Sequence, residues 1–503
     1  MSINVKSTKT LRLAFFLGLM TTAAASIAVE SPPDRGNELK GHWAQQTQAD
    51  LTVMYETIRD AHPGVIDEEN PAFSEWMNEG YRQALIQAQD VDTKVRSQAV
   101  LRRYATGFKD GHLVVYDTNG SGSRRWTGWI VDKRGDDYVV SEAAKDWPVD
   151  VPPVGAKLLR IGGEPVGEHI AREIAPLVDE RLELDSTWMR LAQWLTVRAH
   201  SMPGWSQSLP QHCEIQLPSG EIRTYALSWQ TSDKPVRTQT AAKLPPQGVT
   251  DMGGGRYWIN VREIHPERLT AADLDAFLAA LREVHDARLI VLDTRGNQGG
   301  SSAVGRSILG AAGLLPHAKH NGVEPVAYWR VSTFARDQVA ARVDMFRIHG
   351  EASPEFQWFM RFRDALASAV AQGQPWLVQS DFGAWGKDKA NTQSDAQKHR
   401  HLAARRVLLT DAWCASACLD FADDVLDTPG ALHVGLLTSA DAVYIDIGYR
   451  KLDGGLDFVV PLKVWRHRKR GNNEALIPER RFTGDIYDDV AVKVWVLKQV
   501  SVD

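Results

Sequence analysis

A strand–loop–helix pattern that occurs twice in the second half of the chain most strongly constrains the fold. Residues 288–293 (Arg-Leu-Ile-Val-Leu-Asp) form a short, nearly all-apolar run, which is typical of a strand in a sheet covered on both faces. A glycine-rich loop follows at residues 294–300, and a helical pattern begins at Ser302. The same order returns at residues 407–426. This half is therefore predicted to be an α/β core.

The 503 residues suggest about three domains at ~150 residues each. Residues 29–123 are predicted to be an N-terminal helical region, because apolar residues recur there at helical spacing. Residues 124–232 carry hairpin and glycine-turn signals that indicate a β-rich module. The core occupies residues 233–503, with a polar and aromatic insertion at about 316–404 whose role the sequence does not indicate.

The first residues have the pattern of a targeting segment. Basic residues precede an apolar run at residues 13–25, which is too short to span a bilayer comfortably. Small residues at 26–28 suit signal-peptidase cleavage, so residues 1–28 are predicted to be a signal peptide. We therefore expect an exported protein, periplasmic or secreted, with no stable membrane span after cleavage. An uncleaved anchor is the alternative.

Charge and cysteine usage narrow the possible partners. The net charge of -5 gives no reason to expect nucleic acid, and the basic run at residues 466–470 is interpreted as a solvated loop. Three cysteines do not make a disulfide framework. Cys414 and Cys418 are expected to pack as small residues, although a bridge from Cys213 to one of them stays open. No spacing of His and Cys indicates a metal site, and no cofactor is expected.

Ser416 is the candidate nucleophile. The predicted strand before Ser416 would orient it, and the small alanines on either side would leave it exposed. The N-terminus of the predicted helix that follows would favour negative charge beside it. The glycines of the earlier loop allow backbone N–H groups to approach a ligand, but the loop lacks the lysine of a phosphate-binding loop. We predict an oxyanion hole formed by Gly299 or Gly300 together with the amide of Ala417. A purely structural glycine turn is the alternative.

These two motifs give the chain a family resemblance. The sequence Asp-x-Arg-Gly-Asn-x-Gly-Gly at residues 293–300 and the Ala-Ser-Ala around Ser416 resemble the C-terminal processing, or tail-specific, serine peptidases, whose relatives include the tricorn protease core. The resemblance implies a ClpP/crotonase-like mixed core and a PDZ-like module at residues 124–232. Supporting similarities lie at residues 61–64 (Ala-His-Pro-Gly), 108–112 (Phe-Lys-Asp-Gly-His), 154–166 and 256–261.

The base that would activate Ser416 also follows from the resemblance. One branch of the family has a lysine about 25 residues after the serine, where this chain has Asp441, and Lys451 and Lys463 fit only through a shifted loop. The tricorn-like branch uses a histidine from the Asp-Gly-His element, which corresponds to His112. A neutral imidazole is a competent general base near pH 7.

Three further positions bear on how that base is oriented. The tricorn-like branch has a late glutamate, which corresponds to Glu474, although Asn472 occupies the strictly aligned place. Gly111 stands where tricorn has a serine. Asp110 could pair with His112 or Arg295, or cap a turn.

The sequence thus favours an exported serine peptidase that cleaves peptide or protein substrates through an acyl-enzyme on Ser416, with His112 as general base. A non-catalytic peptide- or small-ligand-binding protein on the same fold is one alternative. An ester-hydrolysing acyl hydrolase is another. The oligomeric state is not indicated.

Overall fold

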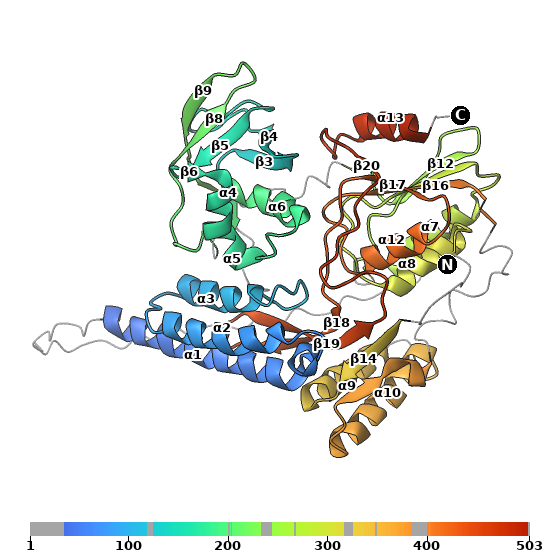
Figure 1. The fold of residues 1–503 in the computed structure, drawn as a ribbon, viewed down its shortest axis with the longest axis horizontal. Coiled ribbons are helices and arrows are strands. Elements are labelled where there is room, and N and C mark those ends of the chain that lie inside the picture. Colours follow the sequence, from blue (N-terminus) through green and yellow to red (C-terminus); the bar gives the residue numbers. More distant parts are fainter. Residues whose placement is uncertain are drawn as a thin grey trace, which may run out of the picture.

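The computed structural model describes residues 35–117, 124–199, 202, 204–232, 244–265, 268–315, 325–347, 350–383, 400–401 and 403–500. It is a mixed α/β protein in which helices and strands from distant parts of the sequence lie side by side (Figure 1). The predicted signal peptide at residues 1–28 lies outside the described residues. Within them, every helix is too short or too polar to cross a membrane.

The predicted α/β core is built on a six-stranded sheet with the order β11-β12-β13-β16-β17-β20. The strands from β12 onward are parallel, and β11 pairs antiparallel to β12. Every residue of β13 is buried, which confirms the prediction for residues 288–293. The strands are β11 (Gly248–Asp251), β12 (Arg256–Asn260), β13 (Leu289–Asp293), β16 (Arg405–Thr410), β17 (Leu432–Gly435) and β20 (Arg480–Arg481).

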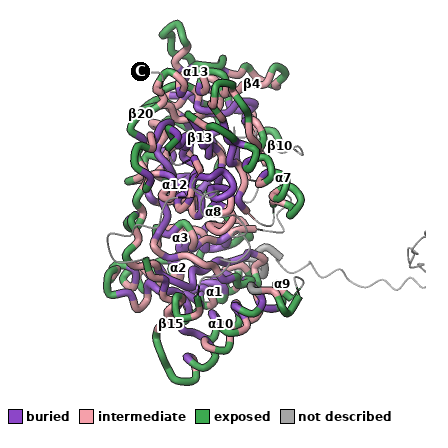
Figure 2. The backbone as a smooth tube through the Cα atoms, turned by 90° about the vertical axis from the view of Figure 1, so that its right-hand side faces the viewer, coloured by how far each residue is buried: buried purple, intermediate pink, exposed green. Residues whose placement is uncertain are grey.

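Helices cover both faces of this sheet, which explains the apolar character of β13. Ile290 and Leu292 pack in one cluster with apolar residues of α7 (Ala271–Arg282), α8 (Ser302–Ala311) and α12 (Ala417–Leu426). Val291 packs on the opposite face with α13 (Asp489–Val500). Figure 2 shows buried residues concentrated around β13, α8 and α12. The candidate site lies at the ends of these strands.

A second sheet, which the sequence did not reveal, joins the N-terminal region to the insertion and to a late hairpin. Its path is β1-β19-β14-β15, with β18 also paired to β19, and every pairing is antiparallel. The predicted insertion therefore contributes two strands to it. The strands are β1 (Val114–Tyr116), β14 (Val326–Arg330), β15 (Trp376–Val378), β18 (Tyr444–Lys451) and β19 (Asp457–Arg466).

Two groups of helices pack on this second sheet in one continuous apolar cluster. The first group confirms the helices predicted in the N-terminal region, namely α1 (Arg35–Ala61), α2 (Ala72–Ala88) and α3 (Lys94–Thr106). The second group comes from the insertion, namely α9 (Thr333–Phe346) and α10 (Pro354–Ala371). The insertion is thus a part of the same core as the N-terminal helices.

The β-rich unit has a separate apolar core. Its main sheet has the order β3-β4-β5-β8-β9, with β6 paired to β5, and a small sheet has the order β10-β2-β7. The main strands are β3 (Trp129–Arg134), β4 (Asp137–Ala143), β5 (Lys157–Ile161), β6 (Glu164–Pro165), β8 (His212–Gln216) and β9 (Ile222–Ala226). The small sheet has β2 (Arg124–Trp126), β7 (Val197–Ala199) and β10 (Gln230–Ser232).

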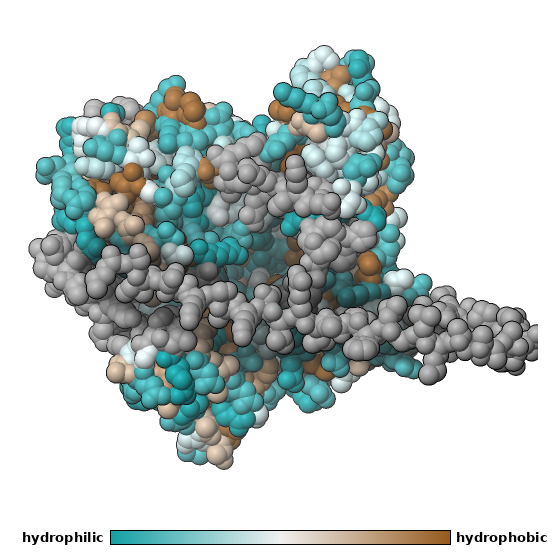
Figure 3. All heavy atoms as spheres, turned by 180° about the vertical axis from the view of Figure 1, so that it is seen from behind, coloured by the Kyte–Doolittle hydropathy of each residue, from teal (hydrophilic) through white to brown (hydrophobic). Residues whose placement is uncertain are grey.

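Short helices complete the β-rich unit. A helical stretch runs through α4 (Val166–His169), a π-helical turn (Ile170–Ile174) and α5 (Ala175–Val178). The helix α6 (Asp185–Ala192) continues into a 3₁₀ turn (Gln193–Leu195). The parts of the opposite face that the described residues form in Figure 3 are mostly hydrophilic, with apolar side chains in small separate groups.

The interpretation of residues 466–470 as a solvated loop is wrong for Arg466 and Arg470, whereas His467 and Lys469 are exposed. The side chain of Arg470 is 2% exposed and pairs with Asp420, Asp423 and Asp441 at 2.9, 2.8 and 2.7 Å. Arg466 pairs with Asp67. Arg470 is buried because carboxylates from α12 and from a neighbouring loop surround it, and a buried charge is tolerated only when it is paired.

Candidate active site

Ser416 lies in a sharp turn between β16 and α12. Its backbone is left-handed, with φ of 53° and ψ of −126°, and its side chain makes no capping hydrogen bond to the helix. A non-glycine residue in such a conformation costs about 1–3 kcal/mol and persists only where the surrounding structure enforces it. A strained strand-to-helix turn of this kind exposes the Oγ of a nucleophilic serine. The sequence prediction of the strand, turn and helix around Ser416 is confirmed.

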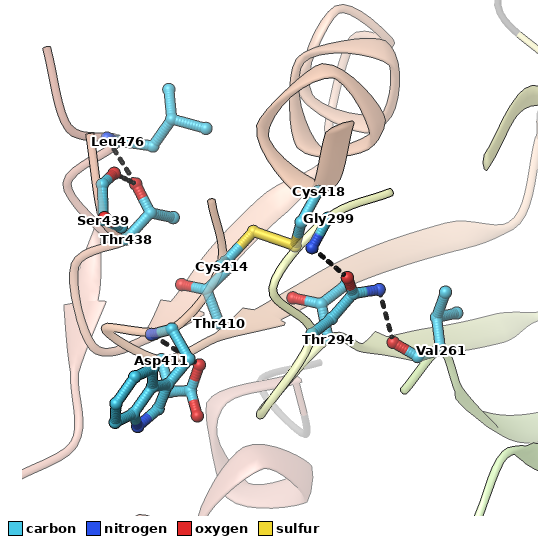
Figure 4. Close-up of a disulfide and its surroundings, with 12 residues drawn as sticks. Val261, Thr294, Gly299, Thr410, Asp411, Cys414, Cys418, Thr438, Ser439 and Leu476 are labelled. Atoms are coloured by element: carbon cyan, nitrogen blue, oxygen red, sulfur yellow. Dashed lines mark hydrogen bonds between the residues drawn. A yellow bond between two sulfur atoms is a disulfide. The ribbon is translucent and has the colours of Figure 1, made fainter. Parts of the chain in front are cut away.

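A disulfide between Cys414 and Cys418 spans this turn, so the expectation that the two cysteines pack unbonded is wrong (Figure 4). The turn folds back onto the first residues of α12, so that the Cα atoms of Cys414 and Cys418 lie 5.3 Å apart. The open alternative of a bridge from Cys213 is also contradicted, because Cys213 is free and buried. Burial raises the pKa of its thiol to about 12. The spacing of four residues in a chain expected to be exported was the available signal for the disulfide.

His112 is brought to Ser416 from 304 residues away, with its Nε2 3.3 Å from the serine Oγ. It lies in the loop between α3 and β1, and its side chain is 17% exposed. The backbone N–H of His112 donates to Asp110 Oδ1 at 2.8 Å. The other ring nitrogen, Nδ1, is buried without a hydrogen-bond partner among the described residues, and Asp110 Oδ1 lies 4.0 Å from it.

A buried histidine supports Asp110 from the other side. The N–H of Gly64 donates to His62 Nδ1 at 2.9 Å, so the ring proton is on Nε2, which lies 3.3 Å from Asp110 Oδ2. His62 is fully buried, and desolvation lowers its pKa despite the nearby carboxylate. The Ala-His-Pro-Gly and Asp-Gly-His elements noted in the sequence therefore meet at Asp110, which holds the loop that carries His112.

Glu474 makes no hydrogen bond or ion pair to His112 among the contacts of the described residues. Its side chain is in an exposed position and its Oε2 accepts a hydrogen bond from the N–H of Gly471 at 2.6 Å, within its own loop. The neighbouring Asn473 is the residue that reaches the histidine loop, where its Nδ2 donates to the Lys109 carbonyl at 2.8 Å. Asn472, in the strictly aligned place, accepts from the N–H of Val443 at 3.0 Å.

Arg181 also supports the histidine loop, and the sequence did not point to it. Its side chain is 3% exposed and donates to the carbonyl of Ala440 at 2.6 Å and to Asn473 Oδ1 at 2.9 Å. A Cβ placed on Gly111 would lie 3.3 Å from its Nη2, so the guanidinium packs where the side chain of residue 111 would be. A glycine at position 111 therefore leaves room for this arginine.

No lysine takes the part of the base among the described residues. Asp441, at the position of the dyad lysine, pairs with Arg470. Lys463 is paired with Asp446 and donates to Gln379 at 3.0 Å, while Lys451 pairs with Asp457 at 2.7 Å. Both lysines therefore belong to the second sheet. The described residues contain no group of His, Cys, Asp and Glu side chains that could hold a metal ion.

The glycine-rich loop packs directly against the serine turn. At Gly299, where φ is +96°, an added Cβ would lie 2.5 Å from the Ala415 carbonyl oxygen and 3.0 Å from the Ala417 nitrogen. The N–H of Gly299 donates to Asn297 Oδ1 at 2.8 Å (Figure 4). That amide is therefore committed, which leaves Gly300 and Ala417 as the candidate oxyanion donors. Ala417 is the first residue of α12.

Buried charges hold the two loops together. Burial alone would raise the pKa of Asp293, but Arg295 and Arg262 hold it well below its usual range. Asp411, at the end of β16, accepts from the N–H of Gly296 at 2.8 Å and from the N–H of Trp413 at 3.0 Å. Burial raises the pKa of Asp411 to about 6. The serine turn and the glycine loop thus share one carboxylate.

Arg295 binds Asp293 and Asp489, so the pairing of Asp110 with Arg295 is not found.

We predict that Gly299→Ala lowers peptide cleavage by about 100-fold, because the new methyl group pushes the glycine loop away from the serine turn. It should also destabilise the fold, which a thermal melt measures. Gly430→Ala is the matched control, since Gly430 has φ of +79° and open space around it. That control carries only the cost of the left-handed backbone, about 1–2 kcal/mol. Equal activity of the two variants would contradict the close packing of Gly299 on the turn.

Solved structures share this arrangement of strands and helices, whereas no protein-family model and no curated protein matches the sequence. The fold is that of CPAF. Mature CPAF, alone and complexed with lactacystin, matches with a TM-score of 0.63 and 14% sequence identity, covering 92% of this chain and 99% and 100% of the CPAF chains. A CPAF mutant matches with a TM-score of 0.65, 13% identity, and coverage of 92% of this chain and 99% of that one. At this identity the likeness shows the fold alone.

Two further matches carry names that belong to the family that the motifs resemble. The photosystem II D1 C-terminal processing protease matches with a TM-score of 0.36 and 13% identity, covering 87% of this chain and 92% of that one. The tricorn protease matches with a TM-score of 0.39 and 11% identity, covering 91% of this chain and 36% of that one. TM-scores this low carry no argument of their own.

Proposed function

We propose that this protein is an exported serine peptidase that cleaves peptide bonds, with Ser416 as nucleophile and His112 as general base. The observation that carries the proposal is the 3.3 Å separation of His112 Nε2 and Ser416 Oγ, across a strained turn at the ends of parallel strands. The same turn lies beside a glycine loop and the first amide of a helix. These are the parts that acyl transfer needs, namely nucleophile, base and oxyanion donors.

The proposed reaction has two steps. His112 Nε2 removes the Ser416 hydroxyl proton as Oγ attacks the scissile carbonyl carbon, and the amides of Ala417 and Gly300 stabilise the negative oxygen. The imidazolium then gives its proton to the leaving amine, which leaves the peptide acyl group on Oγ. A water molecule, deprotonated by His112, releases the acyl group and restores the serine.

The proposal also assigns the two main structural units of the chain. We assign the sheet β11 to β20 with its helices to a ClpP/crotonase-like core, and the unit of residues 124–232 to a PDZ-like module that binds an extended peptide by strand addition. The likeness to CPAF supports a peptidase. A non-catalytic binding protein and an ester-hydrolysing acyl hydrolase are the competing functions on the same fold.

A fluorophosphonate probe separates these functions, because it labels a serine only when a base has activated it. We expect labelling of the wild-type chain at Ser416, found by mass spectrometry of the labelled peptide, and loss of labelling in His112→Ala. An unlabelled but folded wild-type chain would favour the binding protein. Labelled protein that cleaves esters but no peptide would favour the acyl hydrolase.

Asp110 is proposed as the positioning residue for His112, in place of the glutamate expected from the sequence. Asp110→Asn should lower kcat by on the order of 10-fold or more with little change in KM, because the amide cannot stabilise the imidazolium. Glu474→Gln should change kcat by less than about threefold, since an exposed carboxylate contributes little. Steady-state kinetics and the pH profile of kcat measure both. A larger loss in Glu474→Gln than in Asp110→Asn would restore Glu474 to the site.

A further inference from the structure

A cleft separate from the serine and histidine lies between the β-rich unit and the core. One wall is the hairpin between β3 and β4 together with the end of α6, and the other is formed by the segments after β16, β17 and β20. Its empty volume is about 630 Å³, part of it open to solvent. The residues that matter below are Asp132, Arg134, Gln193, Trp413, Asp485 and Tyr487.

The core wall of this cleft is bonded to the loops of the candidate active site. Arg295 in the glycine loop donates to the carbonyl of Ile486 at 2.7 Å, and the hydroxyl of Tyr487 lies 3.3 Å from Asp411 Oδ2. Asp411 is the carboxylate that the glycine loop and the serine turn share. Trp413 lines the cleft three residues before Ser416. A ligand in the cleft therefore lies beside the turn that carries the nucleophile.

Two hydrogen-bond acceptors in the cleft lack donors. Asp132 Oδ2 and Gln193 Oε1 are both buried, and neither has a hydrogen-bond partner among the described residues. Gln193 is only 6% exposed, and its Nε2 is occupied by the carbonyl of Arg190 at 3.0 Å. A buried acceptor without a donor is costly, and such groups in folded proteins commonly await a ligand or water. A ligand group with several hydrogen-bond donors would satisfy both acceptors.

The charged residues of the cleft indicate that this donor-rich group is positively charged. Asp132 and Asp485 supply two carboxylates, and Arg134 lies between them, 3.7 and 3.1 Å away. Lys133 does not balance them, because its ammonium donates to the Gly135 carbonyl at 2.9 Å and lies over the Tyr138 ring. Burial raises the pKa of Asp132 to about 6, and the charge of Asp485 adds to this. A further cation in the cleft would offset both the burial of the Asp132 carboxylate and its repulsion from Asp485.

The remaining walls suit a basic side chain on an extended chain. Trp413, Phe482 and Tyr487 present aromatic rings, which attract guanidinium and ammonium groups. Among the described residues, Arg134 also has a buried Nε without an acceptor. A peptide supplies a carbonyl oxygen for that donor. Its basic side chain supplies hydrogen-bond donors for Gln193 and for Asp132, which Arg134 approaches only to 3.7 Å.

We propose that this cleft binds an arginine or lysine side chain of the peptide substrate, at a position away from the scissile bond. The side chain donates to Asp132 and Gln193 and faces the aromatic rings, while a substrate carbonyl accepts from Arg134. The proposal rests on the proposed peptidase function and deepens it, because it names basic peptides as the substrate class.

The test uses pairs of peptides that differ only by arginine or its neutral isostere citrulline at one position, scanned along the chain. At one position arginine should raise kcat/KM by about 10-fold or more, mainly through a lower KM. Asp132→Asn should remove this preference, so that the arginine and citrulline peptides are cleaved with similar kcat/KM. Asp136→Asn is the matched control, because Asp136 is exposed on the same hairpin and does not line the cleft.

Binding measurements separate this inference from the proposed function. The same peptides are titrated into the full-length Ser416→Ala protein, and the ratio of the two dissociation constants is compared with that of the Ser416→Ala/Asp132→Asn variant. An arginine preference that Asp132→Asn removes supports the cleft even if no peptide is cleaved. Cleavage or binding without an arginine preference, or with a preference that survives Asp132→Asn in a variant with an unchanged melt, overturns it.

Discussion

Replacing Ser416 with alanine is expected to abolish peptide cleavage, with a loss on the order of 10⁴-fold or more, and to leave the thermal melt nearly unchanged. The Ser416 hydroxyl makes no capping bond to α12, and within the described part of the chain its side-chain hydrogen bond is to His112 Nε2. Alanine keeps the same backbone requirement at φ of 53°. The change therefore removes the nucleophile without removing a structural hydrogen bond.

The measurement is the initial rate of cleavage of a fluorogenic peptide, with residual labelling by a fluorophosphonate probe as a second readout. Ser219→Ala is the matched control, because Ser219 lies in an exposed turn of the β-rich unit. Cleavage at the wild-type rate by Ser416→Ala would remove Ser416 from the reaction and would favour a different nucleophile. The melt is measured on the same sample, and a large fall in melting temperature would contradict the expectation that the Ser416 hydroxyl has no structural role.

Reduction of the Cys414–Cys418 disulfide is expected to lower kcat by about 10-fold or more, because the bond closes the turn that holds Ser416 in its left-handed conformation. That conformation costs about 1–3 kcal/mol, so without the bond the serine can relax away from His112. The chain is incubated with a thiol reductant, and kcat and the rate of fluorophosphonate labelling are followed as free thiols appear.

Two variants assign this effect to the disulfide. The double variant Cys414→Ser/Cys418→Ser should resemble the reduced wild type and should no longer respond to reductant. Cys213→Ala should respond like the wild type, because Cys213 is free, buried and has a thiol pKa raised to about 12. Full activity of the double variant would show that packing around the turn is sufficient to hold Ser416.

The parts of the fold that sequence reasoning found are those with local signals. A continuous apolar run predicted β13, glycines predicted the loop after it, and small residues before a helical pattern predicted the turn at Ser416. The second sheet has no such signal. Its first strand, β1, pairs antiparallel with β19 across most of the chain, with Val114 facing Val459. Nothing in the sequence of β1 indicates this partner.

The residues of the candidate site were likewise predicted where a local motif marks them and missed where none does. Ser416 and His112 were predicted from motifs, and the structure brings them together. Glu474 was expected beside them, but its carboxylate is bonded within its own loop. Arg181 and Asn473 were missed because their contacts depend on loops that meet only in the folded chain. The arginines at residues 466–470 were misjudged because a run of basic residues does not reveal the aspartates that surround it.

The pairing of β1 with β19 places a constraint on when the site can assemble. The strand that directly follows His112 pairs with residues 457–459, which come after Ser416 in the sequence. A growing polypeptide has made the histidine early and the serine late, but the strand that supports the histidine loop is completed later still. We therefore expect the pair to come together only after residues 457–459 have been synthesised. Until then His112 would not be held beside Ser416, and the proposed peptidase would be inactive.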